Sequence, residues 1–99
     1  MLMEVPLSAI PHQLVAVVVG NQAFQFEIRQ MGSSIFSSVI VDGEQITRNV
    51  RATQGGELFP WPDQRVNTQF YWEDSQGDEP PQYEGLGSRW HLTYEVDDE

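Results

Sequence analysis

The chain has 99 residues, with fifteen Asp and Glu against five Arg, no Lys and no Cys, and its formal net charge at pH 7 is −10. This length predicts one β-domain over residues 1–99, and the lack of cysteine excludes disulfides and thiolate metal sites. The acidic charge disfavours specific binding to nucleic acid, because affinity for DNA or RNA comes chiefly from cations that displace counterions.

The N-terminal segment gives no support for a membrane or secretory signal. Its longest apolar run, residues 14–19, is too short for a transmembrane helix, which needs about 20 apolar residues. No basic segment precedes this run, so a secretory signal is unsupported and we expect a soluble protein that does not bind membranes. Residues 1–11 place Val5, Leu7 and Ala9 against Pro6 and Ser8. This alternation predicts an edge strand, or an arm that lies on a neighbouring molecule.

A first hairpin is predicted around Gly20-Asn21. The stretch LVAVVV at 14–19 is apolar on both faces and rich in β-branched residues, which is typical of a strand covered on both sides. In QAFQFEIR at 22–29, Phe24, Phe26 and Ile28 share one face, as in a half-buried strand. Glycine between them supplies the positive φ that opens a two-residue turn.

A second hairpin follows at Asp42-Gly43. SSIFSSVIV at 33–41 predicts one strand and EQITRNVRAT at 44–53 the next, and both turn residues tolerate left-handed backbone angles. Beyond it, Pro60 and Pro62 flank Trp61. Proline cannot donate to a strand ladder, so this stretch predicts a loop or a sheet edge.

The last two strands are TQFYWED at 68–74 and RWHLTYEV at 89–96, which each place aromatic residues on one face. A long acidic loop, residues 74–87, joins them, and residues 97–99 form an acidic tail that we expect to be frayed. Gly85 and Gly87 near the loop's end do not fit a phosphate-binding loop, since a strand follows them rather than a helix. We interpret them as a structural corner with positive φ or close packing, with Leu86 in the core.

These elements predict an all-β fold of about six or seven antiparallel strands, arranged as a compact sandwich or a small barrel. The glycines that we expect to serve structural turns are Gly20, Gly43, Gly85 and Gly87.

Catalytic and metal-binding chemistry find little support. The histidines are His12 and His91, no serine lies in a G-x-S-x-G elbow, and His91 is expected in solvent because it alternates with Trp90 and Leu92. A glycosidase needs two carboxylates at a fixed separation across a cleft, and a long polar loop in so small a chain rarely forms such a cleft. A calcium loop needs six to eight oxygen ligands in a suitable register, and the acidic loop lacks the D-x-D-x-D-G register. We predict no enzyme activity, no cofactor and no resident metal.

Aromatic residues at core-facing strand positions account for most of the eleven in the chain. Four others are candidates for a protein interface, because Trp and Tyr are enriched in interface centres. They are Phe59, Trp61, Tyr71 and Tyr83.

Four stretches together resemble a small phage family, namely EVPLSAIPHQ at 4–13, VVVGNQAFQFEIRQ at 17–30, VDGEQI at 41–46 and DEPPQYEGLGSRWHLTY at 78–94. They look like the baseplate plug proteins of contractile-tailed bacteriophages, of the cyanophage type. The most specific elements are VPLSAIP at 5–11 and YEGLG at 83–87, followed by an Arg-aromatic-x-Leu strand. The doubled proline at 80–81 and the extended acidic tail depart from that pattern.

The resemblance implies a non-catalytic structural protein of the virion, made in the host bacterial cytoplasm and held in the central hub where the tail tube meets the puncturing device. Its implied partners are the hub, tube and spike proteins, with a trimer or a hexamer of the chain in the assembly. Under this hypothesis, acidic loop residues face the tube lumen, where DNA must pass without sticking: Asp74, Asp78, Glu79 and Glu84. The alternative is a β-sandwich that binds glycans or a host surface, in which Trp61 and Tyr83 stack on sugar rings.

Overall fold

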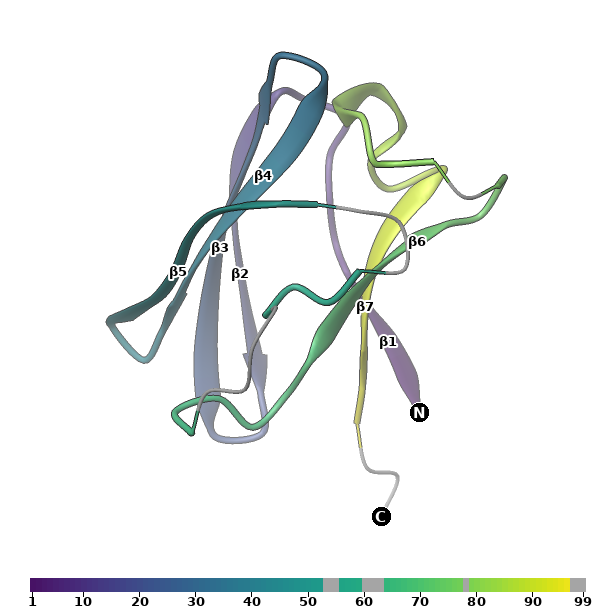
Figure 1. Cartoon of the computed structure of the whole chain (residues 1–99). Coiled ribbons are helices and arrows are strands. Elements are labelled where there is room, and N and C mark those ends of the chain that lie inside the picture. Colours follow the sequence, from purple (N-terminus) through teal and green to yellow (C-terminus); the bar gives the residue numbers. More distant parts are fainter. Residues whose placement is uncertain (53–55, 60–63, 78, 97–99) are drawn as a thin grey trace.

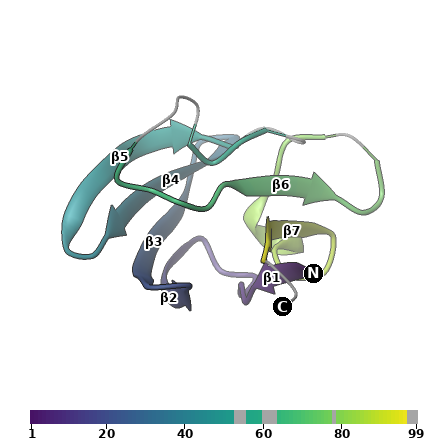
Figure 2. The same ribbon diagram turned by 90° about the horizontal axis from the view of Figure 1, so that it is seen from below.

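The computed structural model describes residues 1–52, 56–59, 64–77 and 79–96, and within these residues the chain is all-β. The sequence prediction of six or seven antiparallel strands is therefore confirmed, with seven strands in the described part of the chain. Two antiparallel sheets, one of four strands and one of three, face each other as a sandwich (Figures 1 and 2). The strands are β1 Leu2–Val5, β2 His12–Val19, β3 Gln22–Met31, β4 Ser34–Val41, β5 Glu44–Arg51, β6 Phe70–Asp74 and β7 Trp90–Glu95, with a 3₁₀ turn at Tyr83–Gly85.

The four-stranded sheet is a meander of order β2-β3-β4-β5, built from three consecutive two-residue hairpins. The first has Gly20 at φ 62°, and the third has Asp42 at 50° and Gly43 at 86°, so both turns predicted from the sequence are confirmed. The middle hairpin, which the sequence analysis did not identify, turns at Gly32 with φ 62°. Positive φ at these positions matches the right-handed twist of the flanking strands, which is why such short turns suffice.

The three-stranded sheet has the order β1-β7-β6 and joins the two ends of the chain. Strand β1 pairs with β7 in the register Leu2 with Glu95 through Val5 with Leu92, and β7 pairs with β6 on its other side. Strand β1, at the start of the described chain, and strand β7, near its last described residue Val96, lie side by side in this sheet (Figure 1). The edge strands of the molecule are therefore β1 and β6 in one sheet and β2 and β5 in the other.

The core lies between the sheets and is dominated by aromatic rings. Phe70 of β6 packs edge-on against Phe24 and Phe26 of β3, with ring centroids 5.1 Å apart in both pairs, and lies 5.0 Å from the ring of Tyr94. Edge-to-face pairs of this kind add stability beyond the burial of apolar area. Because alternate residues of a strand point to opposite faces, the period-two pattern of β3 positions these rings.

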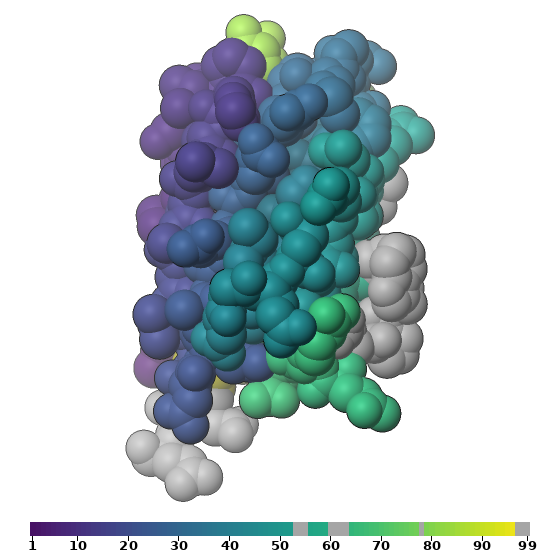
Figure 3. Space-filling view, turned by 90° about the vertical axis from the view of Figure 1, so that its left-hand side faces the viewer, coloured from purple at the N-terminus to yellow at the C-terminus, as the bar shows by residue number. Residues whose placement is uncertain are grey.

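The prediction that residues 14–19 are covered on both sides is wrong. The side chains of Leu14 and Val18 are 78% and 71% exposed, and β2 is an edge strand rather than a central one. Only its inner face meets the core, where Val19 is buried and Val15 and Val17 are half-buried. The same apolar pattern on both faces occurs in a strand that is covered on both sides and in an edge strand whose outer face is exposed, so the pattern alone does not tell which is present. Figure 3 shows the side of the molecule that carries strands β2 to β5.

Candidate functional site

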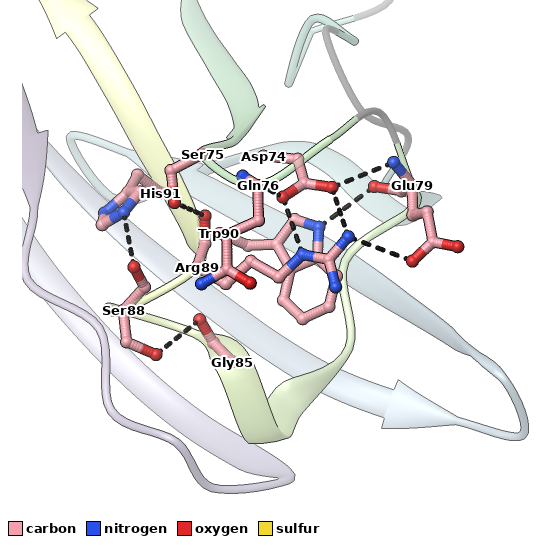
Figure 4. Close-up of polar contacts among 9 residues, drawn as sticks. All are labelled: Asp74, Ser75, Gln76, Glu79, Gly85, Ser88, Arg89, Trp90 and His91. Atoms are coloured by element: carbon pink, nitrogen blue, oxygen red, sulfur yellow. Dashed lines mark hydrogen bonds and ion pairs between the residues drawn. The ribbon is translucent and has the colours of Figure 1, made fainter.

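The acidic loop is fastened by one arginine. Arg89 donates from Nε to Asp74 Oδ1 at 2.7 Å and from a terminal nitrogen to Asp74 Oδ2 at 2.8 Å, a bidentate pair (Figure 4). The same terminal nitrogen donates to Glu79 Oε2 at 3.0 Å. Asp74 also accepts from the backbone N–H groups of Gln76 and Glu79. The carboxylate of Asp74 therefore accepts four hydrogen bonds, two from the Arg89 side chain and two from main-chain N–H groups of its own loop.

This arrangement shifts both pKa values of the pair apart. The guanidinium of Arg89 holds the pKa of Asp74 well below its usual range, and the two backbone N–H donors lower it further, although burial opposes them. The pKa of Arg89 is raised above its ordinary value, first by its hydrogen bonds to Asp74. Both shifts favour the charged forms, so Asp74 and Arg89 form an ion pair that holds the loop against the start of β7.

The stretch around Gly85 and Gly87 packs as a corner beneath this pair. Gly85 is in the 3₁₀ turn without a left-handed φ, but a β-carbon there would lie 2.4 Å from the ring of Trp90. Gly87 has φ +87°, and a β-carbon there would lie 2.6 Å from the carbonyl oxygen of Leu7. Leu86 between them is buried in the core. The two glycines thus allow close packing at both positions, and positive φ is required only at Gly87.

Trp90 connects this corner to the loop. Its indole Nε1 donates to the carbonyl oxygen of Glu79 at 3.0 Å, and the guanidinium of Arg89 lies 4.4 Å from its ring centroid. A cation over an indole face is an attractive arrangement. The loop therefore rests on a buried aromatic ring through both a hydrogen bond and a charge contact.

The four acids that we expected to face the tube lumen lie in different environments. The side chain of Asp74 is fully buried, so Asp74 does not contribute to an exposed acidic surface, which corrects that part of the hypothesis. The sequence could not reveal this burial, because the pairing with Arg89 spans the whole loop. Glu79 is 69% exposed while it contacts Arg89, and Glu84 is exposed. Asp78 lies outside the described residues.

The four aromatic residues that we expected at a protein interface also differ in burial. Phe59 is 4% exposed and belongs to the core, with its ring centroid 6.3 Å from that of Phe70. The prediction that Phe59 lies at the surface is therefore wrong. The reason is that Leu58 donates its N–H to the Phe70 carbonyl at 2.8 Å, which draws this segment against β6. Tyr71 is 41% exposed on the outer face of the three-stranded sheet.

The two remaining candidates do not form a patch with Tyr71 that the structure describes. Tyr83 is half-buried against the core, and its N–H donates to the Gln30 side chain at 3.0 Å, beside the β3–β4 hairpin. Trp61 lies outside the described residues.

His91 is less exposed than expected and has polar partners. Its Nδ1 contacts the carboxylate of Glu4, and its Nε2 faces the carbonyl oxygen of Ser88 at 3.1 Å. The hydroxyl of Ser88 donates instead to the Gly85 carbonyl at 3.3 Å, away from the imidazole. A general base must reach the hydroxyl that it activates, and the hydroxyl of Ser88 is directed to Gly85 instead of to His91.

In the part of the chain that the structure describes, no three side chains among His, Cys, Asp and Glu gather to hold a metal ion. Within the same residues, no helix has the length and apolar character needed to cross a bilayer.

The outer face of the four-stranded sheet is open, which was not predicted from the sequence. A shallow depression of about 300 Å³ lies there, lined by Leu14, Val15, Ala16, Gln25, Phe26, Glu27, Ser38, Ile40 and Gln45. Residues 14–19 are apolar on both faces, which is consistent with an open apolar face, but this pattern was interpreted as a strand covered on both sides.

Charge is unevenly divided between the two sheets. Residues 12–51, which contain the whole four-stranded sheet, hold three acids and three arginines, so their formal charges cancel. The formal net charge of −10 therefore belongs entirely to the rest of the chain. One side of the molecule is neutral and partly apolar, and the remainder is strongly acidic.

A family model described as the cyanophage baseplate Pam3 plug gp18 matches residues 2–98, which is nearly the whole chain. No curated protein matches the chain.

Proposed function

Because the chain belongs to the family of the cyanophage Pam3 baseplate plug, we propose that it is a non-catalytic component of a phage tail baseplate, held at the hub where the tail tube meets the puncturing device. Its partners are the hub, tube and spike proteins, and several copies assemble together as a trimer or a hexamer. Synthesis takes place in the cytoplasm of the host bacterium, and the mature location is the virion.

The observation that carries this proposal is the division of charge between the neutral four-stranded sheet and the acidic remainder. A plug must adhere to neighbouring proteins and yet release the DNA that passes it. Phosphate backbones are repelled by carboxylates and retained by cations. The acidic part therefore suits a surface toward the lumen, with Glu79 and Glu84 as its exposed loop carboxylates, and the neutral part suits protein contacts.

Tyr71 supports a protein contact on the other outer face. It is exposed on β6, and an exposed aromatic ring on a rigid strand can bury a large area at low entropic cost. We assign it to contact with a baseplate neighbour, in place of Phe59.

The first experiment measures binding of the purified chain to its hub protein by light scattering coupled to size exclusion. A stable complex is expected, with Tyr71→Ala weakening it at least about tenfold and Tyr71→Phe close to wild type, because the ring supplies the buried area. Failure to bind hub, tube or spike proteins, together with binding to glycans on an array, would replace the proposal with the glycan-binding alternative.

A second experiment tests the lumen assignment in phage. The double variant Glu79→Lys, Glu84→Lys is expected to slow DNA release from particles that assemble normally. The matched control Glu44→Lys lies in the neutral half, on β5, and is expected to leave release unchanged. Equal DNA release from the double variant, the control and the wild type would place the acidic loop away from the DNA path.

A further inference from the structure

The outer edge of β2 carries main-chain groups that no strand pairs with in the described residues. The Gln30 N–H donates to the Pro11 carbonyl at 2.8 Å, which places these two residues opposite each other just beyond the β2–β3 register. In an antiparallel ladder, hydrogen-bonded and non-hydrogen-bonded pairs alternate. Residues at even positions therefore direct their N–H and C=O groups away from β3: His12, Leu14, Ala16 and Val18.

This edge lacks the usual protection against pairing. Natural edge strands are blunted by lysine, proline, inward-pointing charge, bulges or short length. Strand β2 is eight residues long, has a regular register with β3 and contains no acid, lysine, arginine or proline. Its exposed side chains include Leu14 and Val18, the two most exposed large apolar residues of the described chain.

We propose that a second copy of this chain pairs with β2 antiparallel, about a two-fold axis that passes beside Ala16. Leu14 then lies opposite Val18 of the second copy, and Ala16 lies opposite its own equivalent. This register places even positions opposite even positions, so each pair exchanges both of its N–H···O bonds. The two four-stranded sheets become one continuous sheet.

The sequence of β2 is suited to this symmetry because it is nearly palindromic about Ala16. The outward pair is Leu14 with Val18, and the inward pair is Val15 with Val17. A two-fold interface requires a self-complementary surface, in which residue i contacts j and j contacts i. The pairing covers Leu14 and Val18 on the outer face and further encloses the half-buried Val15 and Val17 on the inner face.

Charge does not oppose a second copy at this edge. Two chains of net charge −10 repel each other over most of their surface, but residues 12–51 sum to zero. Glu27, which lies on β3 opposite Leu14, is matched by His12 at 2.8 Å and by Arg29 at 4.0 Å. Pairing through β2 therefore joins the two four-stranded sheets, in which the formal charges of each chain cancel.

The pairing concerns the free chain and goes beyond the proposed function. It is compatible with a hexamer assembled from three pairs, and it predicts that the chain alone in solution is a dimer rather than a trimer.

Cysteine cross-linking tests the register directly, because the chain has no cysteine of its own. Opposed residues in a hydrogen-bonded pair have Cα atoms about 5.5 Å apart, within the range that a disulfide spans. Ala16→Cys is therefore expected to form a covalent dimer on mild oxidation, seen as a doubled mass on a non-reducing gel. All three test positions are exposed, so the substitutions should not disturb folding, which circular dichroism checks.

Leu14→Cys and Val18→Cys are the matched controls. Each lies four residues out of register with its own equivalent, about 13 Å along the strand, so neither should cross-link alone. A mixture of the two should cross-link, because Leu14 faces Val18 of the other copy. Light scattering of the wild type should give twice the chain mass of 11.3 kDa, and Val18→Lys should give the monomer.

Two results would overturn the pairing. One is equal cross-linking of Leu14→Cys and Ala16→Cys, which would show unspecific or differently registered contact. The other is a monomer at every concentration with no Ala16→Cys dimer. If that monomer still bound the hub protein, the pairing would be refuted and the baseplate role would stand. A dimer that did not bind the hub protein would support the pairing and contradict the baseplate role.

Discussion

Replacing Gly87 with alanine should destabilise the fold more than the same change at Gly20. Both glycines have positive φ, 87° and 62°, so a β-carbon at either position has the strain of a left-handed residue, about 1–2 kcal/mol. At Gly20 nothing lies within 4 Å of the added atom. At Gly87 it would lie 2.6 Å from the Leu7 carbonyl oxygen, which is main chain and cannot rotate away.

The steric part at Gly87 adds about 1–3 kcal/mol, the usual cost of inserting a methyl group where there is no room. For a chain of this size, 1 kcal/mol lowers Tm by roughly 4–8 °C. Gly87→Ala should therefore melt at least about 4 °C below Gly20→Ala, which should itself melt below the wild type.

Thermal unfolding followed by circular dichroism, with urea unfolding as a second measure, gives both differences. Equal Tm values for the two variants would refute the close approach of Gly87 to Leu7, and the corner would then depend on backbone angle alone. Unchanged stability of Gly20→Ala would refute the strain assigned to the hairpin turn.

The remaining predictions concern the core, the loop and the ion pair. Phe70→Ala removes the ring at the centre of the aromatic cluster and should cost about 3–5 kcal/mol in urea unfolding, whereas Tyr71→Ala next to it should cost below about 1 kcal/mol because its ring is exposed. Gly85→Ala should destabilise by about 1–3 kcal/mol through contact with the Trp90 ring, and combining it with Trp90→Leu should cost less than the sum of the two changes. Asp74→Asn should lower Tm at neutral pH. Because the pKa of Asp74 is lowered on folding, the stability from its charge is present above its unfolded pKa of about 4 and is lost as pH falls toward the folded value, so the Tm gap between wild type and variant should narrow below about pH 4. A gap that is the same at pH 3 and pH 7 would contradict the ionic role of Asp74.

Local patterns were sufficient to predict the fold class. Alternation in Phe24, Phe26 and Ile28 depends only on the two-residue period of a strand, and the turns at Gly20 and Asp42-Gly43 depend only on left-handed backbone angles. Both properties are encoded within a few residues. The predictions that failed depend on what lies across the sheet, which no short window contains.

Residues 14–19 and Phe59 illustrate the second case. The outer face of β2 is exposed because β2 is at an edge, and that follows from the order of strands rather than from its own composition. Phe59 is buried because its segment pairs with β6, a contact made across a stretch rich in proline. Asp74 was likewise counted with the exposed acids, since its partner Arg89 lies fifteen residues further along.

The pairing of β1 with β7 has a consequence for synthesis. Strands β2 to β5 are joined by tight turns, so this sheet can form as soon as its own residues have left the ribosome. The partner of β1 is Trp90–Glu95, so the first strand made must wait for the last before it can be hydrogen-bonded. Contacts this distant along the chain slow folding, because their loop entropy is paid before they are formed. During that interval the inner face of the early sheet, with Phe24 and Phe26, has no partner. The nascent protein is therefore most prone to aggregation in the period before β7 has been made.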